Sequence, residues 1–210
     1  MKVSDFKFTQ NDKADAIVRK HLNVICERLV KLLGNELIAI ILGGSFSRGE
    51  GSVTWLNDRP RPLGDYDIYV VTKHRLPRTL VLKLSKDLMR IINIQSEFSF
   101  TDYSPIDFFI DLRCLPIDNL RKLPPLLRYL ELKKTGIILY GPTDIIDQMP
   151  DYKITDIPMV EGIRFLLNRH MCLLEAAPSY MLRNGKLSQT IAQKLIWASI
   201  KMALEWTTNV

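Results

Sequence analysis

The sequence predicts an α+β domain followed by a helical segment. Strand-like and helix-like patterns alternate as far as residue 141, and no strand-like pattern follows it. Short apolar runs bounded by turn residues are typical of buried strands, whereas apolar residues at every third or fourth position are typical of helices. We therefore expect a mixed β-sheet of about four to five strands flanked by helices in residues 1–150, and a helical region in residues 151–210.

The individual elements are predicted as follows. Residues 12–33 have apolar side chains at helical spacing, and Gly34 suits the end of a helix. Further helices are predicted at 78–93, 123–136, 159–176 and 187–206, with a helical turn at 142–149. Strands are predicted at 36–42, 65–72, 105–114 and 137–141.

The composition is typical of a globular protein with a basic surface. The chain has 210 residues, of which 47% are hydrophobic and 25% charged, so it can bury a sizeable core. Its formal net charge of +6 is compatible with an anionic partner such as a nucleotide or a nucleic acid. The apolar runs are too short to span a bilayer, and the first residues lack the apolar core of a signal peptide. We therefore expect a cytoplasmic protein without a membrane segment.

A glycine-rich loop, "GGSFSRGEGS", follows the first predicted strand. Gly43 and Gly44 have no Cβ, so a phosphate can come close to their backbone N–H groups. Ser45 can donate its hydroxyl to a phosphate oxygen, and Arg48 can bind one bidentately. Residues 45–50 are expected to begin a short helix, whose first turn favours an anion. The alternative for Arg48 is a salt bridge with Glu50 that only shapes the loop.

Two aspartates, Asp65 and Asp67, stand at the head of the second predicted strand. Positions i and i+2 of a strand share a face, with Cα atoms about 6.5–7 Å apart. Two carboxylates so close repel each other unless a positive charge lies between them. They can share a pair of Mg²⁺ ions about 3.5–4 Å apart, as in two-metal phosphoryl transfer. The alternative is a solvated turn before a strand.

A third carboxylate is expected from the predicted strand 105–114. Asp107 and Asp111 share one face of this strand but lie at opposite ends of it. Only one of them can therefore meet the pair of Asp65 and Asp67. The strand pattern by itself leaves both candidates open.

The order "GGSFSRGEGS…DYDIYV…FIDLR" resembles the nucleotidyltransferase fold of the DNA polymerase beta superfamily, in its stand-alone bacterial or archaeal form. The resemblance covers roughly residues 15–145. It implies that Gly44 and Ser45 hold a triphosphate and that Asp65 and Asp67 bind metal. It also implies a third acidic metal ligand that helps to deprotonate the attacking hydroxyl. We place this ligand at Asp111, with Asp107 as the alternative.

The resemblance implies an enzyme that uses two Mg²⁺ ions and a nucleoside triphosphate, with ATP expected. Such an enzyme transfers a nucleoside monophosphate to a hydroxyl of a small molecule, a protein or a nucleic-acid end, and releases pyrophosphate. The alternative from another class is a catalytically silent or regulatory protein, antitoxin-like, that binds a helical partner. A nucleic-acid-directed polymerase or terminal transferase ranks lower, because the chain leaves little room for a template-binding domain.

One departure from the family pattern is the length of chain between Ser45 and Asp65. The additional stretch, "VTWLNDRPRPLG", is rich in turn residues and carries Arg59 and Arg61. We expect either a flap that faces the substrate or simply a longer hairpin.

The last predicted helix, 187–206, has more apolar surface than one buried stripe requires. We expect it to pack against the helix at 159–176 on one side and against a second protein surface on the other. That surface would belong to another copy of the chain, giving a homodimer, or to a helical protein partner. The alternative is that the preceding domain covers the helix.

Overall fold

The computed structural model describes residues 6–56, 59–63, 65–95, 110–164 and 166–167. The chain divides into two compact units, one made of residues 1–124 and 131–151 and the other of residues 125–130 and 152–210. The sheet and the candidate site belong to the first unit. In the second unit residues 159–164 and 166–167 are helical, as the sequence predicts. The predicted helix 187–206 lies outside the described residues.

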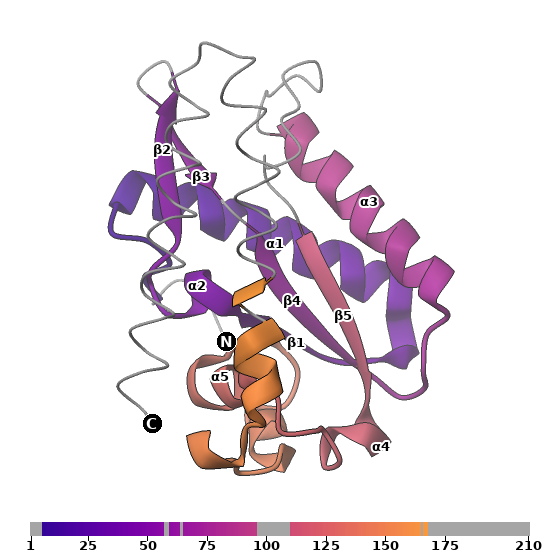
Figure 1. The fold of residues 1–210 in the computed structure, drawn as a ribbon. Helices are drawn as coiled ribbons and strands as arrows, with labels where there is room; N and C mark the ends of the chain where they lie inside the picture. The colour runs from indigo at the N-terminus through magenta and orange to yellow at the C-terminus, as the bar shows by residue number, and fades with distance from the viewer. Residues whose placement is uncertain (1–5, 57–58, 64, 96–109, 165, 168–210) are drawn as a thin grey trace. The chain divides into compact units, whose positions relative to one another are not determined.

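A four-stranded mixed sheet forms the centre of the first unit (Figure 1). Its strands are β1 (Leu37–Gly43), β4 (Tyr66–Thr72), β5 (Ile110–Pro116) and β6 (Ile137–Tyr140), in the order β5-β4-β1-β6. Strand β4 runs antiparallel to β1 and parallel to β5, and β6 runs antiparallel to β1. This arrangement confirms the predicted α+β architecture, and it makes β4 and β1 the two inner strands.

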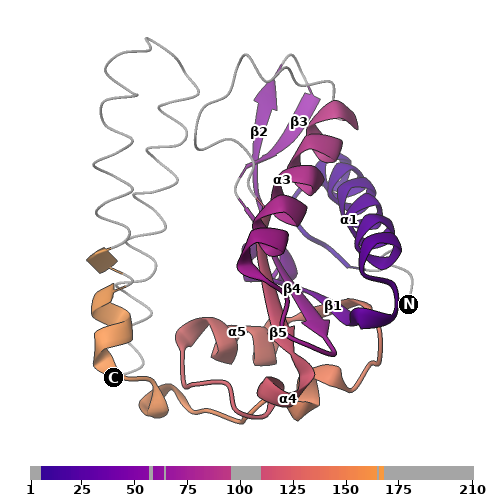
Figure 2. The same cartoon turned by 90° about the vertical axis from the view of Figure 1, so that its right-hand side faces the viewer.

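Two long helices cover one face of this sheet (Figure 2). Helix α1 (Asp12–Leu33) begins after Asn11, whose side chain accepts a hydrogen bond from the backbone N–H of Ala14. It ends at Gly34, where φ is +49°. Helix α3 (Arg78–Gln95) lies beside it and is anchored to β5 by the Ser85 hydroxyl, which donates to the carbonyl of Ile110 over 2.7 Å. Both helices occupy their predicted positions.

The shorter elements complete the two units. They are α2 (Gly44–Ser47), α4 (Ile117–Leu120), α5 (Leu127–Thr135) and the 3₁₀ turns Gly34–Glu36, Ile145–Gln148 and Ile154–Asp156. The Lys133 ammonium donates to the carbonyls of Ile146, Asp147 and Met149, which fixes the turn after β6 to α5. None of the helices among the described residues is both long and apolar enough to cross a bilayer.

The side chains of β4 alternate between the two faces of the sheet. Tyr66, Ile68 and Val70 belong to the apolar core that also contains residues of α1 and α3. Asp67 and Tyr69 therefore lie on the opposite face, because successive side chains of a strand point in opposite directions. The covering of one face by α1 and α3 thus leaves the other face for the acidic residues.

A hairpin accounts for the long connection between the glycine loop and Asp65. Strand β2 (Ser52–Leu56) pairs antiparallel with β3 (Arg59–Leu63), and Ser52 faces Leu63 at its base. The two strands form a sheet of their own. The structure thus resolves the shape of the insertion as a hairpin, whereas a contact with substrate stays a prediction.

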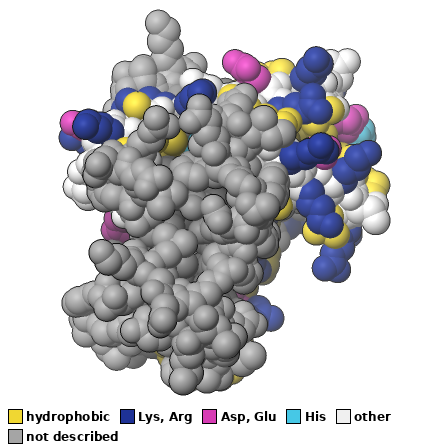
Figure 3. Space-filling model, turned by 90° about the horizontal axis from the view of Figure 1, so that it is seen from above, with side chains coloured by type: hydrophobic (Ala, Val, Ile, Leu, Met, Phe, Trp, Pro, Cys, Tyr) yellow, Lys and Arg dark blue, Asp and Glu magenta, His cyan; other side chains and the backbone are white. Residues whose placement is uncertain are grey.

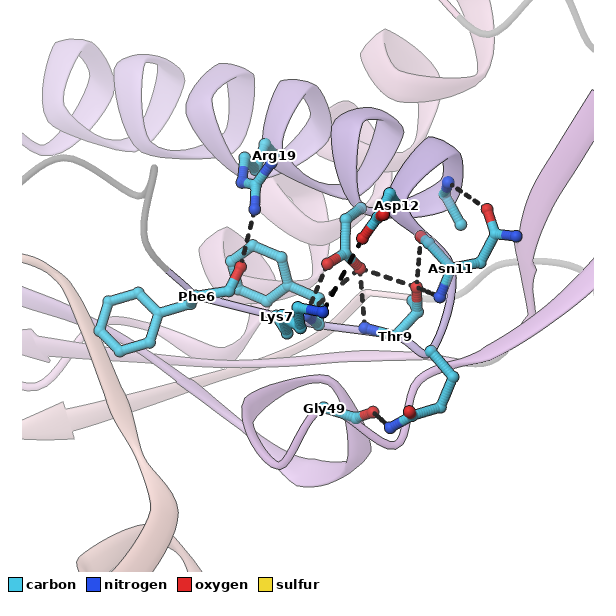
Figure 4. Close-up of polar contacts among 11 residues, drawn as sticks. Phe6, Lys7, Thr9, Asn11, Asp12, Arg19 and Gly49 are labelled. Atoms are coloured by element: carbon cyan, nitrogen blue, oxygen red, sulfur yellow. Dashed lines mark hydrogen bonds and ion pairs between the residues drawn. The ribbon is translucent and has the colours of Figure 1, made fainter.

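The segment before α1 is tied to both the helix and the glycine loop (Figure 4). The Asp15 carboxylate, with 2% of its residue surface exposed, accepts hydrogen bonds from the N–H and the hydroxyl of Thr9 over 2.8 and 2.7 Å, and from the N–H of Phe8 over 3.3 Å. The Phe8 carbonyl accepts from the N–H of Gly51, and the Gln10 amide donates to the Gly49 carbonyl, both over 3.0 Å. Asp15 therefore helps to hold the end of the glycine loop in place.

We predict that Asp15→Ala lowers the free energy of unfolding by about 3 kcal/mol, because buried N–H and O–H donors would lose their acceptor. Urea unfolding followed by circular dichroism measures this loss. The matched control is Asp12→Ala, which removes an exposed carboxylate 4.0 Å from the Lys7 ammonium and should cost less than about 1 kcal/mol. Equal losses in the two variants would contradict the structural role of Asp15.

Candidate active site

Strand register brings two of the predicted carboxylates together. Asp67 of β4 faces Asp111 of the parallel strand β5, and on its other side it faces Gly43 of β1. Neighbouring strands lie about 4.8 Å apart, so the three residues form one row across the sheet. Asp107, the alternative to Asp111, lies outside the described residues.

Asp65 completes the acidic cluster. It immediately precedes β4 and is exposed, whereas Asp67 is largely covered. Burial raises the pKa of Asp67 to about 7, and the neighbouring Asp65 and Asp111 carboxylates add to the rise. The Arg113 guanidinium acts in the opposite direction. The structure therefore places Asp65, Asp67 and Asp111 in one electrostatic cluster whose centre is the Asp67 carboxyl.

Arg113 is a member of this site that the sequence analysis missed. Its guanidinium forms an ion pair with Asp111, two residues earlier on the same face of β5. Its Nε is buried and has no hydrogen-bond partner among the described residues. The signal was present in "DLR", where an acid and a base alternate around one apolar residue. Arg113 therefore orients Asp111.

The glycine loop lies directly against the Asp67 carboxylate. Gly44 has φ of +68°, and a Cβ at this position would lie 2.0 Å from Oδ2 of Asp67. A Cβ on Gly43 would lie 3.0 Å from the ring of Tyr69. The backbone at Gly43 and Gly44 thus approaches β4 so closely that a side chain at either position would collide with it.

The helix after the loop differs from its predicted position. The prediction was residues 45–50, whereas α2 spans only Gly44–Ser47 and a turn follows it. The hydroxyl of Ser47 donates back to the Gly44 carbonyl over 2.8 Å, and the N–H of Glu50 donates to the Ser45 carbonyl over 2.9 Å. The positive φ of Gly49, +71°, ends the helix early. Ser45 therefore lies in a single tight turn next to Asp67.

A buried aromatic contact joins the loop to the acidic strand. Phe46, which follows Ser45, packs edge-on against Tyr66, which stands between Asp65 and Asp67, with ring centroids 4.8 Å apart. The Tyr66 hydroxyl lies 3.1 Å from Nδ1 of His21 in α1. Burial, helped by nearby Lys20, lowers the pKa of His21 to about 4, so this histidine is neutral at neutral pH. Tyr66 anchors the acidic strand from the core side of the sheet.

Arg48 lies between two glutamates. Its Nε is 3.1 Å from Glu50 and its Nη1 is 3.1 Å from Glu131 of α5. The salt bridge with Glu50 is the alternative that the sequence left open, and it is present. A role for Arg48 in phosphate binding stays a prediction. Glu131 was not predicted, because only the tertiary structure brings α5 to the loop; its carboxylate also contributes to the raised pKa of Asp67.

The donor chemistry of the cluster suits a hard divalent cation. Carboxylate oxygens are the ligands that Mg²⁺ takes. The pKa of Asp67 is raised chiefly by burial and further by the Asp65 and Asp111 carboxylates, and Arg113 offsets only part of this rise, so a cation beside Asp67 would favour its charged form. The present side-chain positions suit a cation less well, because the Asp111 carboxylate is already paired with the Arg113 guanidinium. Among the described residues, no three histidine, cysteine or acidic side chains are spaced as a ready-made metal site. A cation would therefore meet Asp65 and Asp67 first.

Comparison with known proteins finds structural similarity only. No protein-family model and no curated protein matches the chain. A spectinomycin adenyltransferase, AAD(9) from Enterococcus faecialis solved with ATP and spectinomycin, has a TM-score of 0.47 and 18% identity, over 74% of this chain and 67% of that chain.

Two further similar chains come from toxin–antitoxin structures. One, solved with AMP-PNP, has a TM-score of 0.39 and 17% identity, over 73% of this chain and 95% of that chain. The other comes from a structure of a tri-AMPylated Shewanella oneidensis HEPN toxin in complex with MNT antitoxin. It has a TM-score of 0.38 and 15% identity, over 79% of this chain and 98% of that chain. At these low identities and scores, the similarities assign no activity to this chain.

We predict that Gly44→Ala destabilises the protein by at least about 2 kcal/mol more than Gly34→Ala. Both variants place a side chain at positive φ, which costs about 1–3 kcal/mol. At Gly34 no atom lies within 4 Å of the new Cβ, whereas at Gly44 the Cβ meets Asp67. In an Asp67→Ala background, which keeps only the Asp67 Cβ at 3.3 Å from the new atom, most of this difference should disappear. A difference that persists unchanged in that background would rule out the contact as its cause.

We predict that, in EDTA, Asp67→Asn becomes more stable than the unmodified protein as the pH rises from about 4 to about 7. The folded-state pKa of Asp67 is raised from 3.8 to about 7, so over this range the unfolded state releases its proton first and folding loses stability. This loss in the free energy of unfolding of the unmodified protein is at most about 4 kcal/mol. It is absent below pH about 4 and no longer changes above pH about 8. Urea unfolding of both proteins across this range measures the difference. A difference that does not vary with pH would contradict the raised pKa.

Proposed function

We propose that the protein is a Mg²⁺-dependent nucleotidyltransferase that moves a nucleoside monophosphate from a triphosphate, with ATP expected, to a hydroxyl acceptor. The observation that supports this most is the contact of the Gly44 backbone with Asp67, beside Asp111 on the next strand. This contact supports the proposal because the loop, whose glycine backbone could receive phosphates, lies against a carboxylate cluster that a cation would stabilise.

Each site residue has a role in this proposal. Asp65 and Asp67 would hold the metal, which supplies neutralisation of the phosphate charge. Asp111 would complete the metal site and accept the proton of the acceptor hydroxyl, oriented by Arg113. The backbone of Gly43 and Gly44 and the hydroxyl of Ser45 would bind the triphosphate, with Arg48 at its edge.

The reaction itself is an in-line displacement at the α-phosphorus. A bond forms from the acceptor oxygen to this phosphorus while the bond to the bridging oxygen breaks, and pyrophosphate leaves. The proton of the acceptor passes to Asp111. The contribution of the protein is mainly to position the two reactants and to stabilise charge. The regulatory alternative is supported by no comparable observation in the described part of the chain.

We predict that the protein labels an acceptor from one of four α-labelled nucleoside triphosphates in a cell lysate, and only when Mg²⁺ is present. Asp67→Asn should reduce turnover at least about 100- to 1000-fold, because it removes a preorganised ligand at the reacting centre. Asp111→Asn should be similarly inactive, and Asp107→Asn should remain active as its matched control. Calorimetry should show that ATP binds more tightly with Mg²⁺ than with EDTA.

Two results would contradict the proposal. Equal ATP affinity in Mg²⁺ and in EDTA would show that nucleotide binding does not involve a metal. Turnover of Asp67→Asn close to that of the unmodified protein would show that the carboxylate cluster takes no part in the reaction. Inactive Asp107→Asn together with active Asp111→Asn would reassign the third carboxylate only.

A further inference from the structure

The outer side of α3 and the turn before it carry a concentration of positive charge. We call this surface the basic face; it consists of Arg75, Arg78, Lys83, Lys86 and Arg90, all of them exposed. Between residues 75 and 90 the chain has a single acidic residue, Asp87, which is partly covered. Figure 3 shows Lys and Arg side chains gathered at the right of the view, where α3 lies in Figure 1.

The cations of the basic face have no partners among the described residues. Within the described part of the chain, none of the five forms an ion pair or a side-chain hydrogen bond. Other basic side chains of this unit are used internally, for example Arg48, Arg113 and Lys133. The described residues therefore leave the positive charge of the basic face uncompensated.

The basic face is also rigidly presented. The inward side of α3 is fixed by the buried side chains of Leu84, Leu88 and Ile92 and by the hydrogen bond of Ser85 to β5. Arg78, Lys86 and Arg90 stand at intervals of eight and four residues and so lie along one line of the helix. This line is about 18 Å long. One strand of a nucleic-acid duplex presents about five phosphates over that length.

We propose that the basic face binds the phosphodiester backbone of a nucleic-acid duplex without reading its sequence. Protein interfaces are depleted in lysine and enriched in aromatic residues, and α3 has two exposed lysines and no aromatic residue. A membrane-surface helix inserts its apolar side into lipid, whereas the apolar side of α3 is buried against the sheet. Among the described side chains of α3, Leu80 and Leu82 are the only large apolar ones that are exposed. A duplex backbone needs only regularly spaced cations.

This surface is separate from the carboxylate cluster. Helix α3 covers the face of the sheet that contains Tyr66, whereas Asp67 lies on the other face. The binding therefore does not depend on the proposed transferase activity. The basic face would hold a nucleic-acid duplex on the protein surface and would not place a reacting atom in the carboxylate cluster.

The test uses the full chain and fluorescein-labelled DNA and RNA duplexes of about 20 base pairs, with anisotropy measured from about 50 to about 200 mM NaCl. The logarithm of the affinity should fall with the logarithm of salt with a slope of about −4 to −5 if all five cations meet phosphates. In the variant Lys83→Glu/Lys86→Glu/Arg90→Glu, binding at the lowest salt should weaken at least about tenfold and the slope should shrink by about 2 to 3.

The matched control has the same change in net charge at three exposed lysines elsewhere, Lys13→Glu/Lys122→Glu/Lys134→Glu. It should bind within about threefold of the unmodified protein. If circular dichroism shows that the glutamate variant is unfolded, the glutamine variant at the same three positions replaces it. Equal weakening in variant and control, or no duplex binding at low salt, would overturn the proposal. Binding to phosphatidylserine vesicles but not to duplexes would assign the surface to membranes instead.

Discussion

The close approach of Gly44 to Asp67 is the constraint on which the site depends. A Cβ at residue 44 would lie only 2.0 Å from a carboxylate oxygen of Asp67, so the chain takes this path without a side chain. The path is held from several directions. Gly43 pairs with Asp67 across the sheet, Phe46 packs on Tyr66 below it, and Phe8 binds the end of the loop through Gly51. The contact is therefore a product of the whole first unit, and a change in any of these supports would alter the distance between loop and carboxylate.

The charges around this contact are unevenly compensated. Each arginine of the site is bound to an outer carboxylate, Arg113 to Asp111 and Arg48 to Glu50 and Glu131. Asp67 lies at the centre of the cluster, where burial and the neighbouring carboxylates disfavour its charged form and so raise its pKa. A positive ligand would be stabilised most at the centre rather than at the rim. The arginines thus limit repulsion among the outer groups without neutralising the position that a cation would occupy.

Much of the first unit could be predicted from the sequence, because local patterns determine it. Helix α1 has a regular apolar repeat with a cap at each end, and its predicted and observed bounds agree. The strand pattern alone left Asp107 and Asp111 open as the partner of Asp67, because register depends on how β4 and β5 meet; only the family resemblance favoured Asp111, which the register places opposite Asp67. Glu131 could not be predicted because only the tertiary structure brings α5 to the glycine loop, whereas Arg113 had a local signal in the alternation of "DLR". Strand β3 was hidden by Pro60 and Pro62, since proline is unusual in strands and is tolerated in a short two-stranded sheet where few backbone donors are needed.

The hairpin β2–β3 leaves and rejoins the domain at the paired residues Ser52 and Leu63. Because it closes upon itself, its length can change without moving the strands on either side, and longer loops add only slowly to the entropic cost of closure. The segment between the glycine loop and the acidic strand is thus modular. Evolution or a protein engineer could shorten it, extend it or exchange it for another hairpin while the geometry at Gly44 and Asp67 is preserved.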